Sequence, residues 1–336
     1  MTMVIEKGAR VAVIGDGGWG TTLAILLHNK GYKVSVWGPF ADYIQLLNRK
    51  RKSPKFLPGI RIPKEIFFSA DIGEVVDESS LIVLVVPSHF LRGVLVRMKG
   101  LNISGTPILS ATKGIENDTL MRMSEVVEDV LGSSKIAALS GPTISYEVAR
   151  GIPATCVVSS EDAQLAREMQ NTLMSGYFRV YTSSDIIGVE LGGALKNVVA
   201  IVCGISDGLG FGANTKAAIL TRGLVEISRL GLAMGARPET FSGLSGLGDL
   251  VTTCISAHGR NRWVGEQIGK GKKLKDILAK MEMVAEGVKT TKSAFMLAER
   301  HKVEMPITAQ VYAVLYEDKD PHLAVQELMG RQKKAE

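Results

Sequence analysis

The sequence contains only three cysteines, and no two of them form a Cys-x-x-Cys pair. So sparse and odd-numbered a set fits a reducing cytoplasm better than a disulfide framework. Long apolar runs are also missing, because the run Leu81–Val86 spans six residues, whereas a helix that crosses a bilayer needs about 18. Residues 1–10 lack the apolar stretch and the small-residue cleavage site of a secretory signal. We therefore expect a cytoplasmic chain without a transmembrane segment.

Patterns for metal and nucleic acid are absent as well. The five histidines show no ligand spacing, so we expect no structural metal. The basic run Arg49–Lys52 with Lys55 is not interleaved with aromatic residues, on which single-stranded nucleic acid would stack, and the neighbouring prolines favour a solvated loop. The net charge of +6 favours anionic partners. A phosphorylated metabolite and a dinucleotide account for that charge as well as nucleic acid does, and we expect no nucleic-acid partner.

The composition is that of an ordinary globular protein, with 46% hydrophobic and 22% charged residues, and 336 residues suffice for two domains. The first 185 residues alternate β-rich runs with amphipathic stretches, which is typical of a parallel sheet with crossover helices. Simple parallel order need not persist to the end of this half. The expected strands are residues 10–14, 32–37, 81–86, 107–111, 135–140, 154–158 and 178–181.

The pattern changes after Ser184. Residues 189–210 and 214–235 have the character of two long helices, and helical segments broken by glycine clusters follow them without a convincing strand. We predict an α/β domain with a doubly wound sheet over residues 1–184 and a mostly helical domain over residues 185–336.

Residues 15–20 form a complete G-x-G-x-x-G pattern between an expected strand and an expected helix, with a second strand starting at Tyr32. Gly15 permits the tight turn, Gly17 lets the backbone approach a pyrophosphate, and Gly20 allows the helix to pack closely on the strand. Free N–H groups at the helix start, with the positive end of its dipole, would receive the pyrophosphate. An ordinary glycine-rich turn is the alternative. This context favours a dinucleotide-binding turn.

The residue that would choose between NAD and NADP is missing from its usual place. An acid at the end of the second strand holds the adenosine ribose, and an arginine accepts a 2′-phosphate. This sequence has Trp37–Phe40 there, with no charge before Asp42. The preference between NAD and NADP is therefore undecided.

One lysine lies in an apolar helix. From residue 191 to 205, Lys196 and Asn197 are the only strongly polar residues. A helix that is apolar on all sides is usually buried, and a buried lysine is usually paired; a lysine that reaches solvent is the alternative. An ammonium at an apolar cavity could polarise a carbonyl and protonate the developing alkoxide during reduction. Glycines in this helix indicate that backbone or ligand comes close to it; they are Gly192, Gly193 and Gly204.

These motifs occur with other distinctive strings in one order, and the chain closely resembles the bacterial NAD(P)-dependent glycerol-3-phosphate dehydrogenases from about Arg10 to Arg331. The strings are GDGGWGTTLA (15–24), KFLPGI (55–60), VPSHFLR (86–92), SATKGIE (110–116), SGPT (140–143), GVELGGALKN (188–197), NTKAAILTRGLVE (214–226), GLSGLGDLVTTC (243–254), RNR (260–262) and AEGV (285–288).

The resemblance implies a Rossmann domain followed by an all-helical domain similar to that of 6-phosphogluconate dehydrogenase. The implied reaction interconverts dihydroxyacetone phosphate and sn-glycerol 3-phosphate with NAD or NADP and supplies phospholipid synthesis. A homodimer is implied by the same analogy.

The resemblance also implies roles for single residues. Lys196 would be the catalytic acid–base group, Lys113 would reach substrate and cofactor, and Asp249 would orient the reacting groups. The other substrate-binding residues would be Gly141, Thr143, Gly259, Arg260 and Asn261. The cofactor-binding residues would be Gly15, Gly17, Gly18, Trp19, Gly20, Phe90, Lys113, Ser145, Arg260, Val284 and Glu286.

The residues themselves support three of these roles. Arg260 opens an expected helix, where an anion would meet a guanidinium and free N–H groups, although an exposed basic turn is the plainer interpretation. Asp249 is the only charge in residues 243–256 and should have a cationic partner, for which Lys196 is the candidate; an N-cap is the alternative. Lys113 follows a strand at the edge where open α/β sheets bind ligands, or is a solvated loop lysine.

Four positions depart from the family's usual residues, which are a serine at Gly18, an arginine at Pro39, an alanine at Ser145 and a serine at Gly259. The first two departures leave the cofactor preference open, and the last removes a hydroxyl from the phosphate site. None removes the proposed chemistry.

Two other functions compete. A dehydrogenase of the 6-phosphogluconate or 3-hydroxyacid type would share the two-domain plan but would not need residues 243–254 or 260–262 as they stand. A non-catalytic dinucleotide-binding regulator would not need Lys196, Asp249 and Arg260 together. Cofactor turnover with each of the three substrates would separate these hypotheses.

Overall fold

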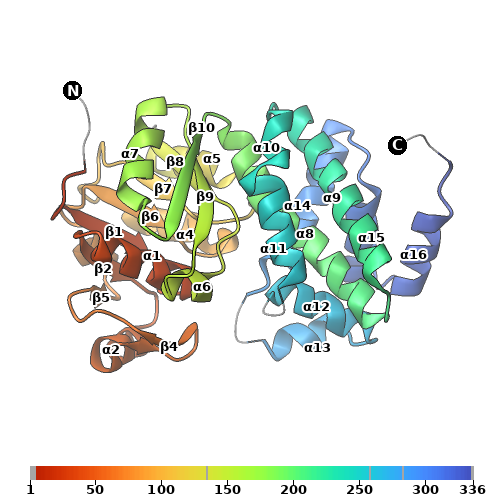
Figure 1. The fold of residues 1–336 in the computed structure, drawn as a ribbon, viewed down its shortest axis with the longest axis horizontal. Coiled ribbons are helices and arrows are strands. Elements are labelled where there is room, and N and C mark those ends of the chain that lie inside the picture. The colour runs from red at the N-terminus through yellow and green to blue at the C-terminus, as the bar shows by residue number, and fades with distance from the viewer. Residues whose placement is uncertain (1–4, 134, 257–258, 282–283, 334–336) are drawn as a thin grey trace. The chain divides into compact units, whose positions relative to one another are not determined.

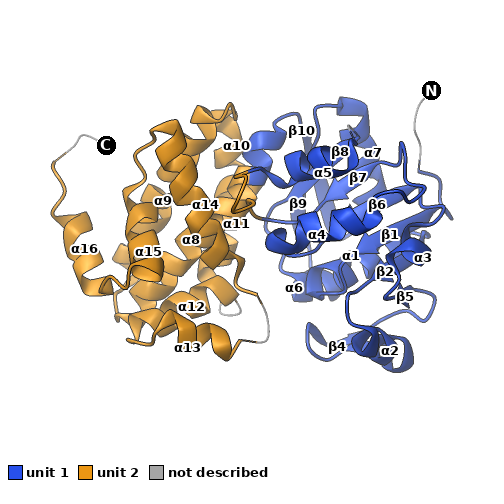
Figure 2. Ribbon diagram, turned by 180° about the vertical axis from the view of Figure 1, so that it is seen from behind, with its two compact units in different colours: residues 1–113, 121–190 blue, residues 114–120, 191–336 orange. Residues whose placement is uncertain are grey.

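The computed structural model describes residues 5–133, 135–256, 259–281 and 284–333; His258 lies outside them. Contacts divide the chain into two compact units (Figures 1 and 2). Unit 1 comprises residues 1–113 and 121–190, and unit 2 comprises residues 114–120 and 191–336. The division therefore falls after residue 190, inside a long helix, and the short segment 114–120 belongs with the helical unit.

Unit 1 is built on an eight-stranded sheet with the order β10-β9-β8-β7-β6-β1-β2-β5. Neighbouring strands are parallel except β8 and β9, which are antiparallel. Strand order reverses between β1 and β6, where open α/β sheets bind their ligands. The strands are β1 (Arg10–Ile14), β2 (Lys33–Trp37), β5 (Phe67–Ser69), β6 (Leu81–Leu84), β7 (Ile108–Ser110), β8 (Ile136–Ser140), β9 (Ala154–Ser159) and β10 (Phe178–Ser183), with a separate antiparallel pair of β3 (Lys52–Ser53) and β4 (Leu57–Arg61).

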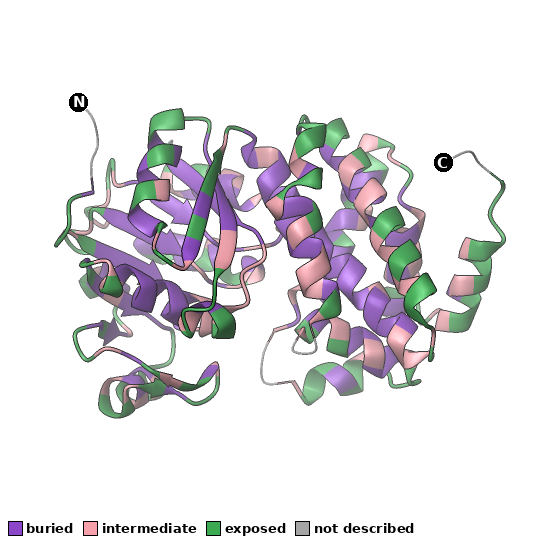
Figure 3. Ribbon diagram, in the orientation of Figure 1, coloured by how far each residue is buried: buried purple, intermediate pink, exposed green. Residues whose placement is uncertain are grey.

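Helices cover both faces of this sheet. Side chains of β1 alternate between two apolar clusters, Val11 and Val13 in one and Ala12 and Ile14 in the other. Helices α1 and α7 contribute to the first cluster, and α3, α4 and α5 contribute to the second. Burial on both faces explains why the central strands β1 and β6 are almost entirely apolar (Figure 3). The helices are α1 (Gly18–Asn29), α2 (Ala41–Lys50), α3 (Ile72–Val76), α4 (Ser88–Met98), α5 (Met123–Leu131), α6 (Ser145–Ala149) and α7 (Ala163–Leu173).

All seven expected strands are confirmed to within two residues of their predicted bounds, and parallel order breaks between β8 and β9. The edge strand β5 and the pair β3–β4 were not expected. The basic run is therefore not a plain solvated loop: Arg49 and Lys50 end α2, Lys52 lies in β3, and Arg51 donates from Nη1 to the Ile66 carbonyl at 2.7 Å. Lys55 is exposed in the turn between β3 and β4.

Unit 2 is helical, and its described residues contain no strand, as expected. Its first helix, α8, begins in unit 1 and is long and apolar enough to cross a membrane, but 89% of its most apolar window is buried inside the protein, as in a core helix. The helices are α8 (Ile186–Gly208), α9 (Ala213–Ala233), α10 (Pro238–Ser242), the π-helix η1 (Leu244–Gly248), α11 (Asp249–Ile255), α12 (Arg260–Gly269), α13 (Leu274–Ala279), α14 (Glu286–His301), α15 (Pro306–Tyr316) and α16 (Pro321–Met329).

Candidate active site

The glycine turn of unit 1 connects β1 to α1 at the point where strand order reverses. Gly15 has φ +133°, and a Cβ added to it would lie 2.7 Å from the Val85 carbonyl oxygen. A Cβ on Gly20 would lie 1.9 Å from the Gly15 carbonyl oxygen, so α1 can only pack this closely on the turn without a side chain there. A Cβ on Gly17 would meet no protein atom within 4 Å, which leaves open space above the turn.

The first turn of α1 is suited to an anion. The helix begins at Gly18, within the glycine pattern rather than after it, and its N-cap Gly17 has no side chain to cap the free N–H groups. The first turn contains no acidic residue. Backbone donors, the helix dipole and the open space at Gly17 together fit a dinucleotide pyrophosphate. The residues of this turn therefore fit the cofactor that the pattern predicts.

Four other residues of the predicted cofactor set belong to unit 1, and three of them lie in or beside this turn. A Cβ on Gly18 would be 2.9 Å from the Phe56 carbonyl oxygen and 3.4 Å from the Ser145 Oγ. Gly18 and Ser145 are therefore neighbours, and there is little space for a side chain at Gly18. Trp19 packs against the apolar core, and its buried Nε1 has no hydrogen-bond partner among the described residues. Phe90 lies in the first turn of α4, after β6, with a largely exposed side chain.

Lys113 lies just after β7 and meets the other predicted substrate residues of unit 1. Its Nζ donates to the Gly141 carbonyl oxygen at 3.1 Å and lies 3.5 Å from the Thr143 Oγ1. The Thr143 hydroxyl also donates to the Gly141 carbonyl, at 3.1 Å. Gly141 has φ +127°, and a Cβ there would lie 2.9 Å from the Cys156 Cα. This bend after β8 can therefore be made only by glycine, and it turns the Gly141 carbonyl toward the lysine.

In unit 2, Lys196 of α8 and Asp249 of α11 form a buried ion pair. The Lys196 Nζ donates to the Asp249 Oδ1, and the two residues are 6% and 1% exposed. The expected partner of Asp249 is confirmed, and Lys196 does not reach solvent. Asp249 is the first residue of α11, whose N-cap is Gly248, so its carboxylate binds the lysine rather than capping the helix.

The glycines of α8 allow the close packing that this pair needs. A Cβ on Gly192 would lie 2.5 Å from the Ser245 carbonyl oxygen in η1, the segment that leads into Asp249. A Cβ on Gly204 would lie 1.9 Å from the Arg262 carbonyl oxygen in α12. The close approach predicted from the glycines is confirmed at both positions, and in both cases the approaching group is backbone.

The predicted phosphate residues open α12. Gly259 is the N-cap and offers no side-chain cap, Arg260 is the first helical residue, and Asn261 is buried beside it. The Arg260 Nη1 donates to the Val284 carbonyl oxygen at 3.0 Å, and the Asn261 Oδ1 accepts from the Gly287 N–H at 2.9 Å. An exposed guanidinium thus lies at an uncapped helix N-terminus, which is an arrangement for binding an anion.

Val284 and Glu286, the predicted cofactor-side residues of unit 2, lie next to this helix start. Glu286 is the first residue of α14, and a Cβ on the following Gly287 would lie 2.7 Å from the Asn197 carbonyl oxygen. This contact brings the start of α14 against α8 at the residue that follows Lys196. The starts of α12 and α14 and the middle of α8 therefore pack together within unit 2.

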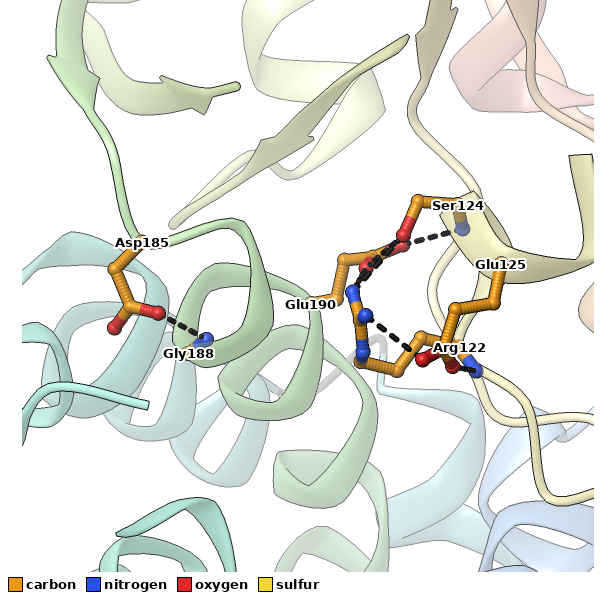
Figure 4. Close-up of polar contacts among 6 residues, drawn as sticks. All are labelled: Arg122, Ser124, Glu125, Asp185, Gly188 and Glu190. Atoms are coloured by element: carbon orange, nitrogen blue, oxygen red, sulfur yellow. Dashed lines mark hydrogen bonds and ion pairs between the residues drawn. The ribbon is translucent and has the colours of Figure 1, made fainter. Parts of the chain in front are cut away.

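The first turns of α8 are held within unit 1 by a buried charged network (Figure 4). Arg122 donates from Nη1 to Glu190 at 2.6 Å and from Nη2 to Glu125 at 2.9 Å, while the N–H and hydroxyl of Ser124 donate to Glu190 at 2.8 and 2.6 Å. Burial raises the pKa of Glu190, and Arg122 and Ser124 oppose that rise. At the helix start, the Asp185 Oδ1 accepts from the Gly188 N–H at 2.9 Å. No pattern in the sequence predicts this network, because its residues are far apart along the chain.

A Rossmann-type sheet with a dinucleotide turn, followed along the chain by helices that carry a buried lysine–aspartate pair, defines a nicotinamide-dependent dehydrogenase. Family models described as the N-terminus and the C-terminus of NAD-dependent glycerol-3-phosphate dehydrogenase match residues 10–166 and 185–326. The chain belongs to the NAD-dependent glycerol-3-phosphate dehydrogenase family.

Individual relatives are similar to this chain over nearly its whole length. The glycerol-3-phosphate dehydrogenase [NAD(P)+] of Syntrophotalea carbinolica is 51% identical over 97% of this chain and 99% of its own length. The enzyme of the same name from Geobacter sulfurreducens is 49% identical over 97% and 98%. The crystal structure of glycerol-3-phosphate dehydrogenase from Coxiella burnetii has a TM-score of 0.94 at 38% identity and covers 97% of this chain and 100% of its own. The chain is accordingly an NAD(P)-dependent oxidoreductase.

Proposed function

We propose that the chain interconverts dihydroxyacetone phosphate and sn-glycerol 3-phosphate, with Lys196 as the acid–base group. The enzyme class follows from the family, and the role of the lysine rests on one observation above all, the buried Lys196–Asp249 pair. Keeping two charges out of water is costly. The lysine lies on the apolar helix α8, which packs against α12 and the start of α14 within unit 2. Such an arrangement suits proton transfer to a substrate that carries an anionic group. By this reaction the enzyme would supply glycerol 3-phosphate for phospholipid synthesis.

Lys196 has a separate task in each direction. During reduction its ammonium polarises the substrate carbonyl and gives a proton to the oxygen as negative charge develops there. During oxidation the neutral amine accepts the proton of the alcohol. Asp249 holds the lysine side chain in place through the buried ion pair, so it orients the group that touches the substrate.

Arg260 is proposed to bind the substrate phosphate, together with Asn261 and the N–H groups at the start of α12. The guanidinium presents several donors to a phosphate, and the helix N-terminus adds backbone donors and a favourable dipole. Gly259 contributes its backbone to this turn. We propose Lys113 as a further substrate contact, with Gly141 and Thr143 shaping the backbone around its ammonium.

The bound nicotinamide cofactor supplies or accepts the hydride. The glycine turn would hold its pyrophosphate on the N–H groups of α1, with Gly18, Trp19 and Ser145 beside it. Phe90 would contribute from the first turn of α4. Val284, Glu286 and Arg260 are the residues of unit 2 that we assign to the cofactor. Residues 1–184 would thus be the NAD(P)-binding domain and residues 185–336 the substrate and catalytic domain.

We also propose that the enzyme works as a homodimer in the cytoplasm. The three cysteines support the compartment, because all are buried as free thiols and none forms a disulfide. Family analogy supports the dimer, and light scattering of the purified chain tests it: a monomer at working concentration would contradict it.

One experiment tests the proposed reaction. NADH and NADPH oxidation is measured with dihydroxyacetone phosphate, and reduction of the oxidised cofactors is measured with glycerol 3-phosphate, 6-phosphogluconate and a 3-hydroxyacid. We expect turnover with dihydroxyacetone phosphate and glycerol 3-phosphate only. Turnover with 6-phosphogluconate or the hydroxyacid instead would assign a different substrate, and cofactor binding without turnover on any of them would indicate a regulator.

A further inference from the structure

Asp16, the second residue of the glycine turn, has a buried carboxylate beside the end of β2. The residue is 8% exposed. A Cβ added to Gly38, which directly follows β2, would lie 2.1 Å from the Asp16 Oδ2 and 2.4 Å from its Cγ. The Asp16 carboxylate therefore occupies the space that a side chain at the end of β2 would fill. In dinucleotide-binding folds that side chain is the acid that binds the adenosine ribose.

The same carboxylate lacks a hydrogen-bond partner that its burial requires. Oδ2 is buried and has none among the described residues, and a buried carboxylate without a partner is costly. The titratable groups that face it are Tyr43 of α2 and Lys55 of the β3–β4 turn. Burial raises the pKa of Asp16 to about 6, while its own backbone N–H and Lys55 act in the opposite direction. A ligand that donates hydrogen bonds would satisfy this oxygen.

We propose that Asp16 selects between the two cofactors, by accepting hydrogen bonds from the adenosine ribose hydroxyls of NADH and repelling the 2′-phosphate of NADPH. The inference rests on the proposed function, because it assigns this turn to the cofactor. Asp16 takes the place of the acid that is missing after β2, because its carboxylate reaches the end of β2 from the glycine turn and Gly38 leaves space for it. Lys55 acts against this selection, since its ammonium attracts a 2′-phosphate.

The selection depends on pH in a defined direction. Asp16 is an acid with a raised pKa, so its carboxylate is mainly neutral below pH 6 and ionised above it. Both the acceptor for ribose hydroxyls and the repulsion of phosphate belong to the ionised form. The preference for NADH therefore increases as pH rises through 6. The 2′-phosphate of NADPH also titrates near this pH, so the effect of Asp16 has to be isolated by a variant.

Isothermal titration calorimetry of the full chain with NADH and with NADPH, at pH 5.5 and pH 8, tests the proposal without turnover. The measured quantity is the ratio of the NADPH dissociation constant to the NADH dissociation constant. We expect Asp16→Asn to lower this ratio at pH 8 by about tenfold or more, the typical effect of a hydrogen bond to a charged group, and to lower it far less at pH 5.5. Asp42→Asn is the matched control, because Asp42 is an exposed acid in the first turn of α2, and we expect it to leave the ratio unchanged.

An unchanged ratio in Asp16→Asn, or an equal change in Asp42→Asn, would overturn the proposal. A second variant, Lys55→Gln on the exposed turn, keeps Asp16 in place and keeps the proposal testable at pH 8 if Asp16→Asn does not fold. We expect it to raise the ratio, and an unchanged or lowered ratio there would count against the proposal. Failure of the wild-type chain to bind either cofactor would refute the proposed function itself, which separates the two failures.

Discussion

Replacing Lys196 with methionine tests its proposed catalytic role but also removes the cation that Asp249 binds. Methionine keeps the apolar stem and adapts to an irregular cavity, but it leaves Asp249 buried at 1% exposure without its cation. Breaking one side of a buried ion pair costs about 3–5 kcal/mol, a large fraction of the about 5–15 kcal/mol that stabilises a typical domain. The single variant should therefore be clearly less stable in urea unfolding, and its loss of activity alone would not be informative.

The double variant Lys196→Met with Asp249→Asn removes both charges and resolves this ambiguity. Because no uncompensated charge remains, most of the lost stability should return, less about 1–3 kcal/mol for a buried amide with imperfect hydrogen bonds. Turnover should not return. Loss of general acid catalysis lowers kcat by about 10²–10⁴-fold, and we expect that loss in both variants, while NADH affinity measured by calorimetry changes little.

Two results would refute this reasoning. If Lys196→Met retains near-wild-type kcat with dihydroxyacetone phosphate, the proton comes from Lys113 or from water. If the double variant regains turnover together with stability, the lysine serves only to neutralise Asp249. A loss of kcat that persists in the stable double variant is the result that the acid–base assignment requires.

The proposed phosphate site, the glycine turn and the charged network of Arg122 and Glu190 each provide a further test. Arg260→Ala should raise KM for dihydroxyacetone phosphate by about 10–100-fold, the range for a charge-assisted contact, and affect unphosphorylated dihydroxyacetone much less; equal losses in steady-state kinetics would make the residue structural. Gly17→Ala should weaken NADH binding with little effect on urea unfolding, whereas Gly20→Ala, whose Cβ would overlap backbone, should destabilise the fold; the reverse pattern would contradict the geometry of the turn. Arg122→Met should lower the free energy of unfolding, measured in urea, by about 3–5 kcal/mol, because it leaves Glu190 buried without its cation. Adding Glu190→Gln should restore part of that loss. An unchanged free energy of unfolding in Arg122→Met would show that the network does not stabilise the protein.

The strands that sequence analysis located and those it missed differ in burial. Residues 81–86 and 154–158 are mostly apolar runs rich in β-branched residues, because these strands lie inside the sheet, and such runs can be recognised from sequence alone. Strand β5 has three residues at the edge of the sheet and carries no comparable run. The pair β3–β4 includes Pro58 and is adjacent to Pro54, which favour loops in any single-sequence interpretation.

Some contacts of the candidate site could likewise be predicted from sequence, and others could not. The pairing of Lys196 with Asp249 could be predicted from sequence because each is an isolated charge in an apolar segment. A buried charge without a partner of opposite charge is costly, so each was expected to have one. Asp16 could not be assigned, because the acid of a dinucleotide site is sought at the end of the second strand and Asp16 precedes that strand. Only the packing of its carboxylate against Gly38 reveals that it reaches the same place. The Arg122–Glu190 contact was equally out of reach, since it joins residues 68 positions apart through the tertiary fold.

The glycines of helix α8 determine how closely its neighbours pack and, through Gly192, where Asp249 lies. These glycines cost helix stability, by about 1 kcal/mol each relative to alanine, and the apolar surface of α8 is long enough for a membrane. Most of its apolar window is buried inside the protein, and the backbone of η1 approaches Gly192 so closely that any side chain there would displace it. Because η1 runs directly into Asp249, the glycine sets how near the carboxylate comes to Lys196. The position of the Lys196–Asp249 pair therefore depends on a residue that has no side chain.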